Sequence, residues 1–204
     1  MITIISILVL VVSVVLHELS HGIVADRLGD PTARYAGRLT LNPLKHLDPV
    51  GSFLVPLSLI VSGAPFVFGW AKPVPYNPYN LSDRRWGPAL VGLAGPLSNV
   101  GVAVLFGLMI RLGAVYRPFI ETLGTLMVLI VFTNLVLALF NLIPIPPLDG
   151  SKLVYALLPV KYLRAYARIE AFGFIIVIGL LYFCGSYLLS WPVALAFRLI
   201  TGVG

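Results

Sequence analysis

The stretch Val14-Val15-Leu16-His17-Glu18-Leu19-Ser20-His21 places two histidines and a glutamate within a run that is apolar enough to enter a membrane. Positions i and i+4 of a helix share one face, so His17 and His21 can point at the same metal ion. Glu18 lies one position further round and can reach a water molecule bound to that metal. Because ionisable groups are costly in hydrocarbon, the cluster predicts a functional metal site inside a membrane.

The composition around this cluster is that of a membrane protein. The 204 residues are 59% hydrophobic and 11% charged, with a mean hydropathy of +0.98, whereas soluble domains carry about 25% charged residues. We therefore expect a single membrane-embedded domain over residues 1–204. The lone Cys184 excludes an internal disulfide and a cysteine-rich zinc site. The net charge of +6 is typical of basic loops on the cytoplasmic side, so no nucleic-acid partner is expected.

The apolar runs predict an all-α integral membrane protein with about four spanning helices, a re-entrant, partly extended segment and interfacial helices. The expected spans cover residues 2–25, 87–112, 120–143 and 171–189. Residues 52–68 are apolar but short and contain Pro56, and the proline-punctuated stretch 69–75 cannot be helical. The basic, tyrosine-containing stretch 151–168 suits a membrane interface, and the tail from Trp191 is too short to span and is expected on the surface.

The distribution of positive charge distinguishes two topologies. If residues 52–68 cross the membrane, the basic residues are split between its two faces. If they enter and return, the basic stretches 26–48, 70–86 and 151–168 all face the cytoplasm, as the positive-inside rule favours. This re-entrant topology also makes the first and third spans parallel and brings Asp149 to the same side as the two histidines.

A catalytic zinc ion needs three protein ligands and one open position for water. The two histidines supply two ligands, and the acidic residues are few enough for the third to be sought by position. Asp149 is the best candidate, because it follows a proline-rich break at the inner end of an apolar helix. The alternative for Asp149 is that it caps a helix beginning near Gly150. The remaining acidic residues are less well placed: Asp26, Asp30, Asp48, Asp83, Glu121 and Glu170.

Two motifs together resemble the site-2 protease family of intramembrane zinc metalloproteases: His17-Glu18-Leu19-Ser20-His21 and Asn141-Leu142-Ile143-Pro144-Ile145-Pro146-Pro147-Leu148-Asp149-Gly150. Residues 94–99 and 69–75 are also similar to family segments, the latter to a minimal branch without PDZ or CBS domains. The resemblance implies a zinc-dependent endopeptidase with one Zn2+ per chain. By resemblance, the metal ligands are His17, His21 and Asp149, Glu18 is the general base, and Asn141 holds the substrate carbonyl or its oxyanion.

The expected function is hydrolysis of peptide bonds in or near transmembrane segments of other membrane proteins, as in regulated intramembrane proteolysis. The expected location is a prokaryotic plasma membrane, with the active site toward the cytoplasmic side. Three alternatives remain: a catalytically silent adaptor that binds membrane helices, a membrane zinc protease of another family, and a metal transporter. The second would take Glu121 or Glu170 as its third ligand, and the third would need polar groups in the outer halves of the spans, which are nearly absent.

Several other residues are expected to be structural. Asn99 is interpreted as a packing contact, Trp70 as an anchor at the membrane interface, and His46 as a loop residue and not a ligand. Four small residues of the second span are expected to allow close helix packing: Gly92, Gly95, Ser98 and Gly101.

Overall fold

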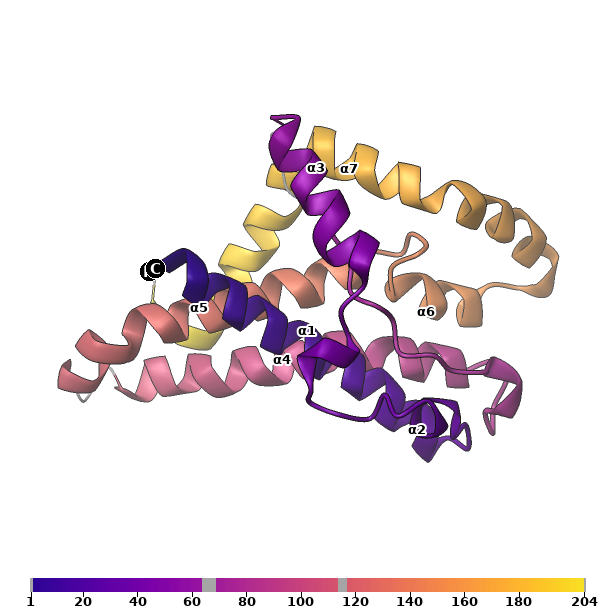
Figure 1. The fold of residues 1–204 in the computed structure, drawn as a ribbon, viewed down its shortest axis with the longest axis horizontal. Coiled ribbons are helices and arrows are strands. Elements are labelled where there is room, and N and C mark those ends of the chain that lie inside the picture. Colours follow the sequence, from indigo (N-terminus) through magenta and orange to yellow (C-terminus); the bar gives the residue numbers. More distant parts are fainter. Residues whose placement is uncertain (1, 64–68, 114–116, 204) are drawn as a thin grey trace.

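The computed structural model describes residues 2–63, 69–113 and 117–203, which form helices and loops with no β-strand among them (Figure 1). The elements in chain order are α1 Ile2–Arg27, α2 Thr32–Tyr35, η1 Pro43–Lys45, η2 Pro49–Leu54, α3 Val55–Val61, η3 Pro78–Asn80, α4 Gly87–Gly113, α5 Arg117–Asn141, α6 Gly150–Leu157 and α7 Val160–Thr201.

Four helices are long and apolar enough to cross a membrane, which confirms the predicted fold class. They cover Thr3–Arg27, Gly87–Gly113, Leu123–Asn141 and Val160–Cys184. The 26 residues of α1 rise about 39 Å at about 1.5 Å per residue, more than the ~30 Å thickness of a hydrocarbon core. The fourth span begins earlier than the sequence predicted, at Val160 instead of residue 171.

Helix α4 lies at the centre of the fold and packs against α1, α5, α6 and α7. It runs opposite to α1 and α5 (Figure 1). The glycines of α4 allow its neighbours to pack closely. A Cβ atom at Gly92 would lie 2.8 Å from the Lys152 side chain, and one at Gly107 would lie 2.3 Å from Ile200. The expected close packing is thus confirmed at Gly92. A Cβ atom at Gly101 would have no neighbouring atom within 4 Å, so this part of the prediction is wrong.

The C-terminal tail is not a surface segment, so the prediction for the chain from Trp191 onward is wrong. It continues α7, which contains Pro192 and changes direction between its two halves (Figure 1). Val193 is buried in a cluster with Ala103 of α4 and Val131 of α5. The tail therefore does not need to span the membrane, because it buries its apolar face against two helices that do.

The segment around α3 leaves the bundle and returns beside its own start. The N–H of Trp70 donates to the carbonyl of Gly51 over 3.1 Å, and the N–H of Lys72 donates to the carbonyl of His46 over 2.9 Å. Between these points, the large apolar side chains of η2 and α3 are exposed, as contact with lipid requires. The two ends of the segment therefore lie side by side, which is the arrangement that the re-entrant topology requires.

The three basic stretches consequently gather at one end of the bundle. The N–H of Ser82 donates to the carbonyl of Leu28, and Nε of Arg85 donates to the carbonyl of Ala156, both over 2.9 Å. These contacts join the end of α1 to the beginning of α4 and the end of α6. The arrangement is the one that the positive-inside rule favoured.

Candidate metal centre

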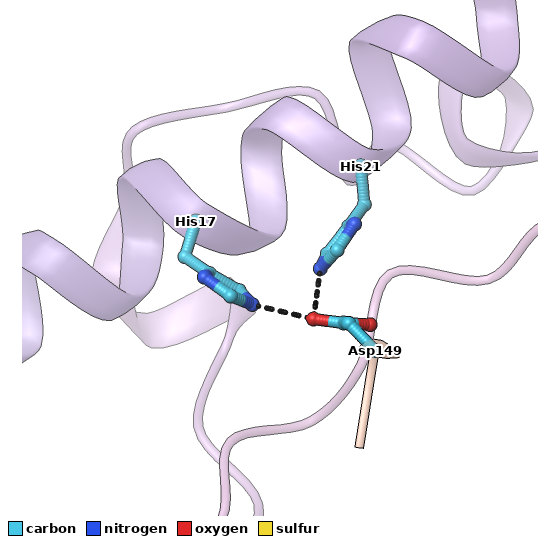
Figure 2. Close-up of side chains that lie close together, drawn as sticks. All are labelled: His17, His21 and Asp149. Carbon is cyan, nitrogen blue, oxygen red and sulfur yellow. Dashed lines mark hydrogen bonds and ion pairs between the residues drawn. The ribbon is translucent and has the colours of Figure 1, made fainter. Parts of the chain in front are cut away.

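Three side chains from two distant parts of the chain meet inside the bundle (Figure 2). His17 and His21 project from the same face of α1, and their relative exposures are only 6% and 7%. Asp149 reaches them from the turn between α5 and α6. Its Oδ2 atom lies 3.0 Å from Nε2 of His17 and 3.2 Å from Nε2 of His21.

The opposite nitrogen of each imidazole is held by an acceptor on α4. Nδ1 of His21 donates to the backbone carbonyl of Val91 over 2.6 Å, and Nδ1 of His17 donates to the Asn99 side-chain oxygen, also over 2.6 Å. A neutral histidine that carries its proton on Nδ1 presents a lone pair on Nε2. Two such lone pairs and a carboxylate oxygen therefore face one another, and a cation between them would satisfy all three.

The donor set fits zinc. Two imidazole nitrogens and one carboxylate oxygen, with a fourth position open, are the ligands of a catalytic zinc site. Space for an ion is kept by Gly95, since a Cβ atom there would lie 2.5 Å from Nε2 of both His17 and His21. Any other residue at this position would place its side chain against the ligand atoms.

Asp149 is held in place by its neighbours in the Asp-Gly turn. A Cβ atom at Gly150 would lie 2.2 Å from the carbonyl oxygen of Leu142, so only glycine allows the turn to pack this tightly against the end of α5. Lys152 donates from Nζ to Oδ1 of Asp149 over 2.8 Å and leaves Oδ2 facing the histidines. Asp149 stands at the N-cap position of α6 but makes no capping bond with its side chain, so the capping alternative is wrong.

The charge state of Asp149 follows from these contacts. Burial by itself would raise the pKa of this carboxyl group, but hydrogen bonds from His17 and His21, which form when their Nε2 atoms carry protons instead of a metal, and the charge of Lys152 hold its pKa well below the ordinary value. Burial by itself would lower the pKa of Lys152, but the pairing with Asp149 raises it above its ordinary value. Asp149 is thus an anion, as a metal ligand must be.

Asn99 belongs to a buried polar network that the sequence interpretation missed. Its Nδ2 atom donates to Oδ1 of Asn134 over 2.8 Å, and Asn134 donates to Oγ of Ser13 over 2.9 Å. Both asparagines have no exposed surface. Asn99 therefore orients His17 from behind and is itself fixed by α5 and α1, instead of being only a packing contact. An amide side chain without a hydrogen-bond partner is costly within an apolar helix. The presence of Asn99 and Asn134 in apolar spans was therefore the signal in the sequence for such a network.

Glu18 faces a cavity of about 680 Å3 beside the metal centre. Its carboxylate accepts a 2.9 Å hydrogen bond from the backbone N–H of Val74, in the extended stretch that returns from the re-entrant segment. That stretch is fixed in turn by Arg38, a buried side chain whose guanidinium donates to the carbonyls of Lys72 and Pro73. The general base predicted from the sequence is therefore anchored to the cavity wall.

Asn141 and Trp70 line the same cavity. The Asn141 side chain donates over 2.9 Å to the carbonyl of Leu137 in its own helix. Among the described residues, no other element provides a hydrogen-bond partner for this side chain. Trp70 stacks edge-to-face on Phe174 of α7, with ring centroids 5.6 Å apart. The prediction that Trp70 is an interface anchor therefore misses its position in the cavity wall.

The other acidic candidates whose side chains the structure describes, and His46, lie elsewhere; the side chain of Glu121 is outside the described part of the chain. Within residues 2–63, 69–113 and 117–203, His17, His21 and Asp149 form the one group of three that could hold a metal ion. Asp26 pairs with Arg34. His46 is buried, and its Nε2 donates to the carbonyl of Thr40, which confirms that it is a loop residue.

Comparisons with known sequences find similarity to a family of peptidases. A sequence model of peptidase family M50 matches residues 112–184, which include Asp149. YwhC of Bacillus subtilis is 40% identical over 198 residues, covering 94% of this chain and 86% of the relative. Rip2 of Mycolicibacterium smegmatis is 37% identical over 174 residues, covering 83% of this chain and 63% of the relative. Both relatives bear the name "Putative zinc metalloprotease". No solved structure is significantly similar to the chain.

Proposed function

Because this chain belongs to peptidase family M50, the site-2 proteases, we propose that it is an intramembrane zinc metalloprotease that cleaves other membrane proteins in or near their transmembrane segments. The convergence of His17, His21 and Asp149 inside a bundle of four apolar helices carries the proposal. We assign the activity to one membrane-embedded domain over residues 1–204 and one Zn2+ to each chain.

The proposed roles follow from the positions of the side chains. Zinc supplies Lewis acidity, which makes water a nucleophile near neutral pH. Glu18 accepts the proton of that water and passes it to the leaving amine. Asn141, in the wall of the cavity, turns its amide toward the substrate carbonyl and stabilises its developing negative charge.

The returning stretch suits an unwound substrate. Trp70, Lys72 and Val74 donate their N–H groups to the protein, so the alternate residues face away, as in an edge strand. A substrate segment that pairs with this edge lies next to Glu18, because Val74 holds the carboxylate. The prolines at 73 and 75 lack an N–H, and the Pro73 carbonyl accepts from Arg38, so this edge offers a substrate mainly the carbonyls of Ala71 and Pro75.

The proposed orientation places the active site toward the cytoplasm. The basic stretches gather at the end of the bundle where α1 ends and α4 begins, and positive loops face the cytoplasm. His17 is about 22 Å along α1 from its outer end at ~1.5 Å per residue, in the inner half of a ~30 Å core. Water would reach the zinc from that side, in a prokaryotic plasma membrane.

The test is cleavage of single-spanning reporters by the purified protein in detergent micelles. Wild-type protein is expected to release fragments cut near the cytoplasmic end of the reporter helix, whereas Glu18→Gln keeps its zinc and releases none. Asp149→Ala is expected to lose zinc. Equal behaviour of wild type and Glu18→Gln would favour the adaptor alternative, and zinc retained by Asp149→Ala would favour a zinc protease with a different third ligand.

A further inference from the structure

A second cavity, of about 740 Å3, adjoins the catalytic one at the basic end of the bundle. Tyr76, Pro147 and Lys152 line both cavities, so the two lie side by side. The second cavity lies among the beginning of α4, α6 and the beginning of α7, which meet at one end of the molecule (Figure 1). We call it the basic groove; its polar and aromatic lining includes Tyr76, Tyr79, Arg84, Arg85, Lys152 and Glu170.

The basic groove carries more positive than negative charge. Its lining has three cationic side chains and a single carboxylate, that of Glu170. Lys152 is neutralised by its bond to Asp149. Among the described residues, neither Arg84 nor Arg85 forms an ion pair with a carboxylate. The Asp83 carboxylate lies within electrostatic reach of Arg85, so the positive charge that the groove leaves unbalanced lies chiefly at Arg84.

Both guanidinium groups are fixed by contacts that leave their charge available. The Arg84 guanidinium carbon lies 6.0 Å from the centre of the Tyr79 ring, within the range of a cation–π contact. Nε of Arg85 donates over 2.9 Å to the carbonyl of Ala156 at the end of α6. A bound anion would therefore meet positioned donors, and arginine is the residue best suited to grip a carboxylate.

A polypeptide that occupies the catalytic cavity lies next to this groove, because the two cavities share lining residues. We propose that the basic groove is a substrate subsite for an acidic stretch of the substrate chain, on the cytoplasmic side of the scissile bond. This inference rests on the proposed function and adds a specificity to it.

The subsite also implies rejection of most membrane proteins. The cytoplasmic flank of an ordinary transmembrane helix is rich in Lys and Arg. The excess positive charge of the groove, chiefly that of Arg84, repels such a flank, and discrimination through repulsion is a common source of specificity. A groove with this charge selects the uncommon membrane protein whose cytoplasmic flank is acidic.

The experiment uses three single-spanning reporters that differ only in the flank after the scissile region, which carries three Glu, three Gln or three Lys residues. Wild-type protein is expected to cleave the Glu reporter with a kcat/KM about fivefold above that of the Lys reporter, a size suited to partly screened charge contacts. Arg84→Glu is expected to remove or reverse this preference. The matched control is Arg164→Glu, an exposed position of α7 outside the groove, which is expected to keep the preference.

Binding is measured separately, with fluorescent Glu and Lys reporters and the Glu18→Gln protein, so that the subsite can be tested without cleavage. Tighter binding of the Glu reporter, lost in Glu18→Gln combined with Arg84→Glu, supports the proposal. Equal cleavage and equal binding of the three reporters would overturn the subsite and leave the protease intact. If Arg84→Glu changes the cleavage of all three reporters equally, and only when anionic phospholipid is present, the groove binds lipid headgroups. That result would also overturn the proposal. If no reporter is cleaved but the binding preference is found, the proposed hydrolysis fails and the subsite stands.

Discussion

Gly95 gives the sharpest single test of the metal centre. A Cβ atom at this position would lie 2.5 Å from Nε2 of both His17 and His21, and 2.6 Å from Cε1 of His17. Ordinary contacts of this kind begin near 3.4 Å, so Gly95→Ala requires the rings to retreat by about 1 Å. Zinc–nitrogen bonds are about 2.0–2.1 Å long, and a displacement of that size removes the ligand geometry.

We expect Gly95→Ala to lower zinc affinity at least about 100-fold, the upper end of what is lost when a ligand loses its support. The metal-free protein should lose no more than about 1–3 kcal/mol of stability, as for a methyl group forced into a packed site. Zinc affinity is measured by competition with a chelator, and stability by thermal unfolding in excess chelator.

Gly101→Ala is the matched control on the same helix. No atom lies within 4 Å of a Cβ placed at Gly101, so this change should leave zinc affinity intact and gain up to about 1 kcal/mol of helix propensity. If Gly95→Ala binds zinc as tightly as Gly101→Ala does, the described arrangement of the two imidazoles is wrong.

Three further predictions concern the supports of the site and of the fold around it. Asn99→Ala removes the acceptor for Nδ1 of His17 and should lower zinc affinity about 10- to 100-fold, as measured by chelator competition. Ser98→Ala is the control, because the described hydrogen bond of Ser98 is to Gly95 of its own helix. Gly150→Ala should displace the third ligand through a clash with backbone and abolish zinc binding, measured as metal content. Burial by itself would raise the pKa of Asp30, but hydrogen bonds from Thr32, Asn80 and Asn77 hold it below its ordinary value. Its contribution to stability is therefore full above about pH 4 and lost as the pH falls further. Asp30→Asn should lower the stability by about 1–3 kcal/mol and make the melting temperature depend less on pH below about pH 4; an unchanged melting profile would contradict this.

The sequence predicted the histidine pair and its partner for different reasons. The spacing of His17 and His21 is a local property of a helix, so it needed no tertiary information. Asp149 is 128 residues away from His21, but a membrane protein has few carboxylates, and its place after the proline-rich break left it as the best candidate. Its approach to 3.2 Å of His21 agrees with that choice.

The supports of the site could not be predicted in the same way. The contacts of Asn99, Asn134 and Ser13 depend on which faces of three helices meet, and apolar helices without a strong polar face leave that rotation open. A small residue at position 95 predicted close packing in general, but the sequence did not show which residues would lie against Gly95. Only the assembled bundle shows that this glycine lies against the two histidine rings.

The error in the tail has a similar origin. Length decides whether a helix can span a bilayer, but it does not decide whether a shorter helix lies on the surface or packs inside. Val193 and Ile200 of α7 pack on α4 and α5, where Gly107 leaves room for Ile200. That complementarity between a glycine and an isoleucine far apart in the chain is invisible to periodicity.

Zinc-edge X-ray absorption spectroscopy on the purified protein tests most directly whether α1 and the Asp-Gly turn bind the same zinc ion. The account predicts one zinc per chain with two imidazoles at about 2.0–2.1 Å and oxygen in the remaining positions, and the loss of this spectrum in Asp149→Ala. A wild-type spectrum with fewer than two imidazoles, or one that Asp149→Ala leaves unchanged, would contradict it.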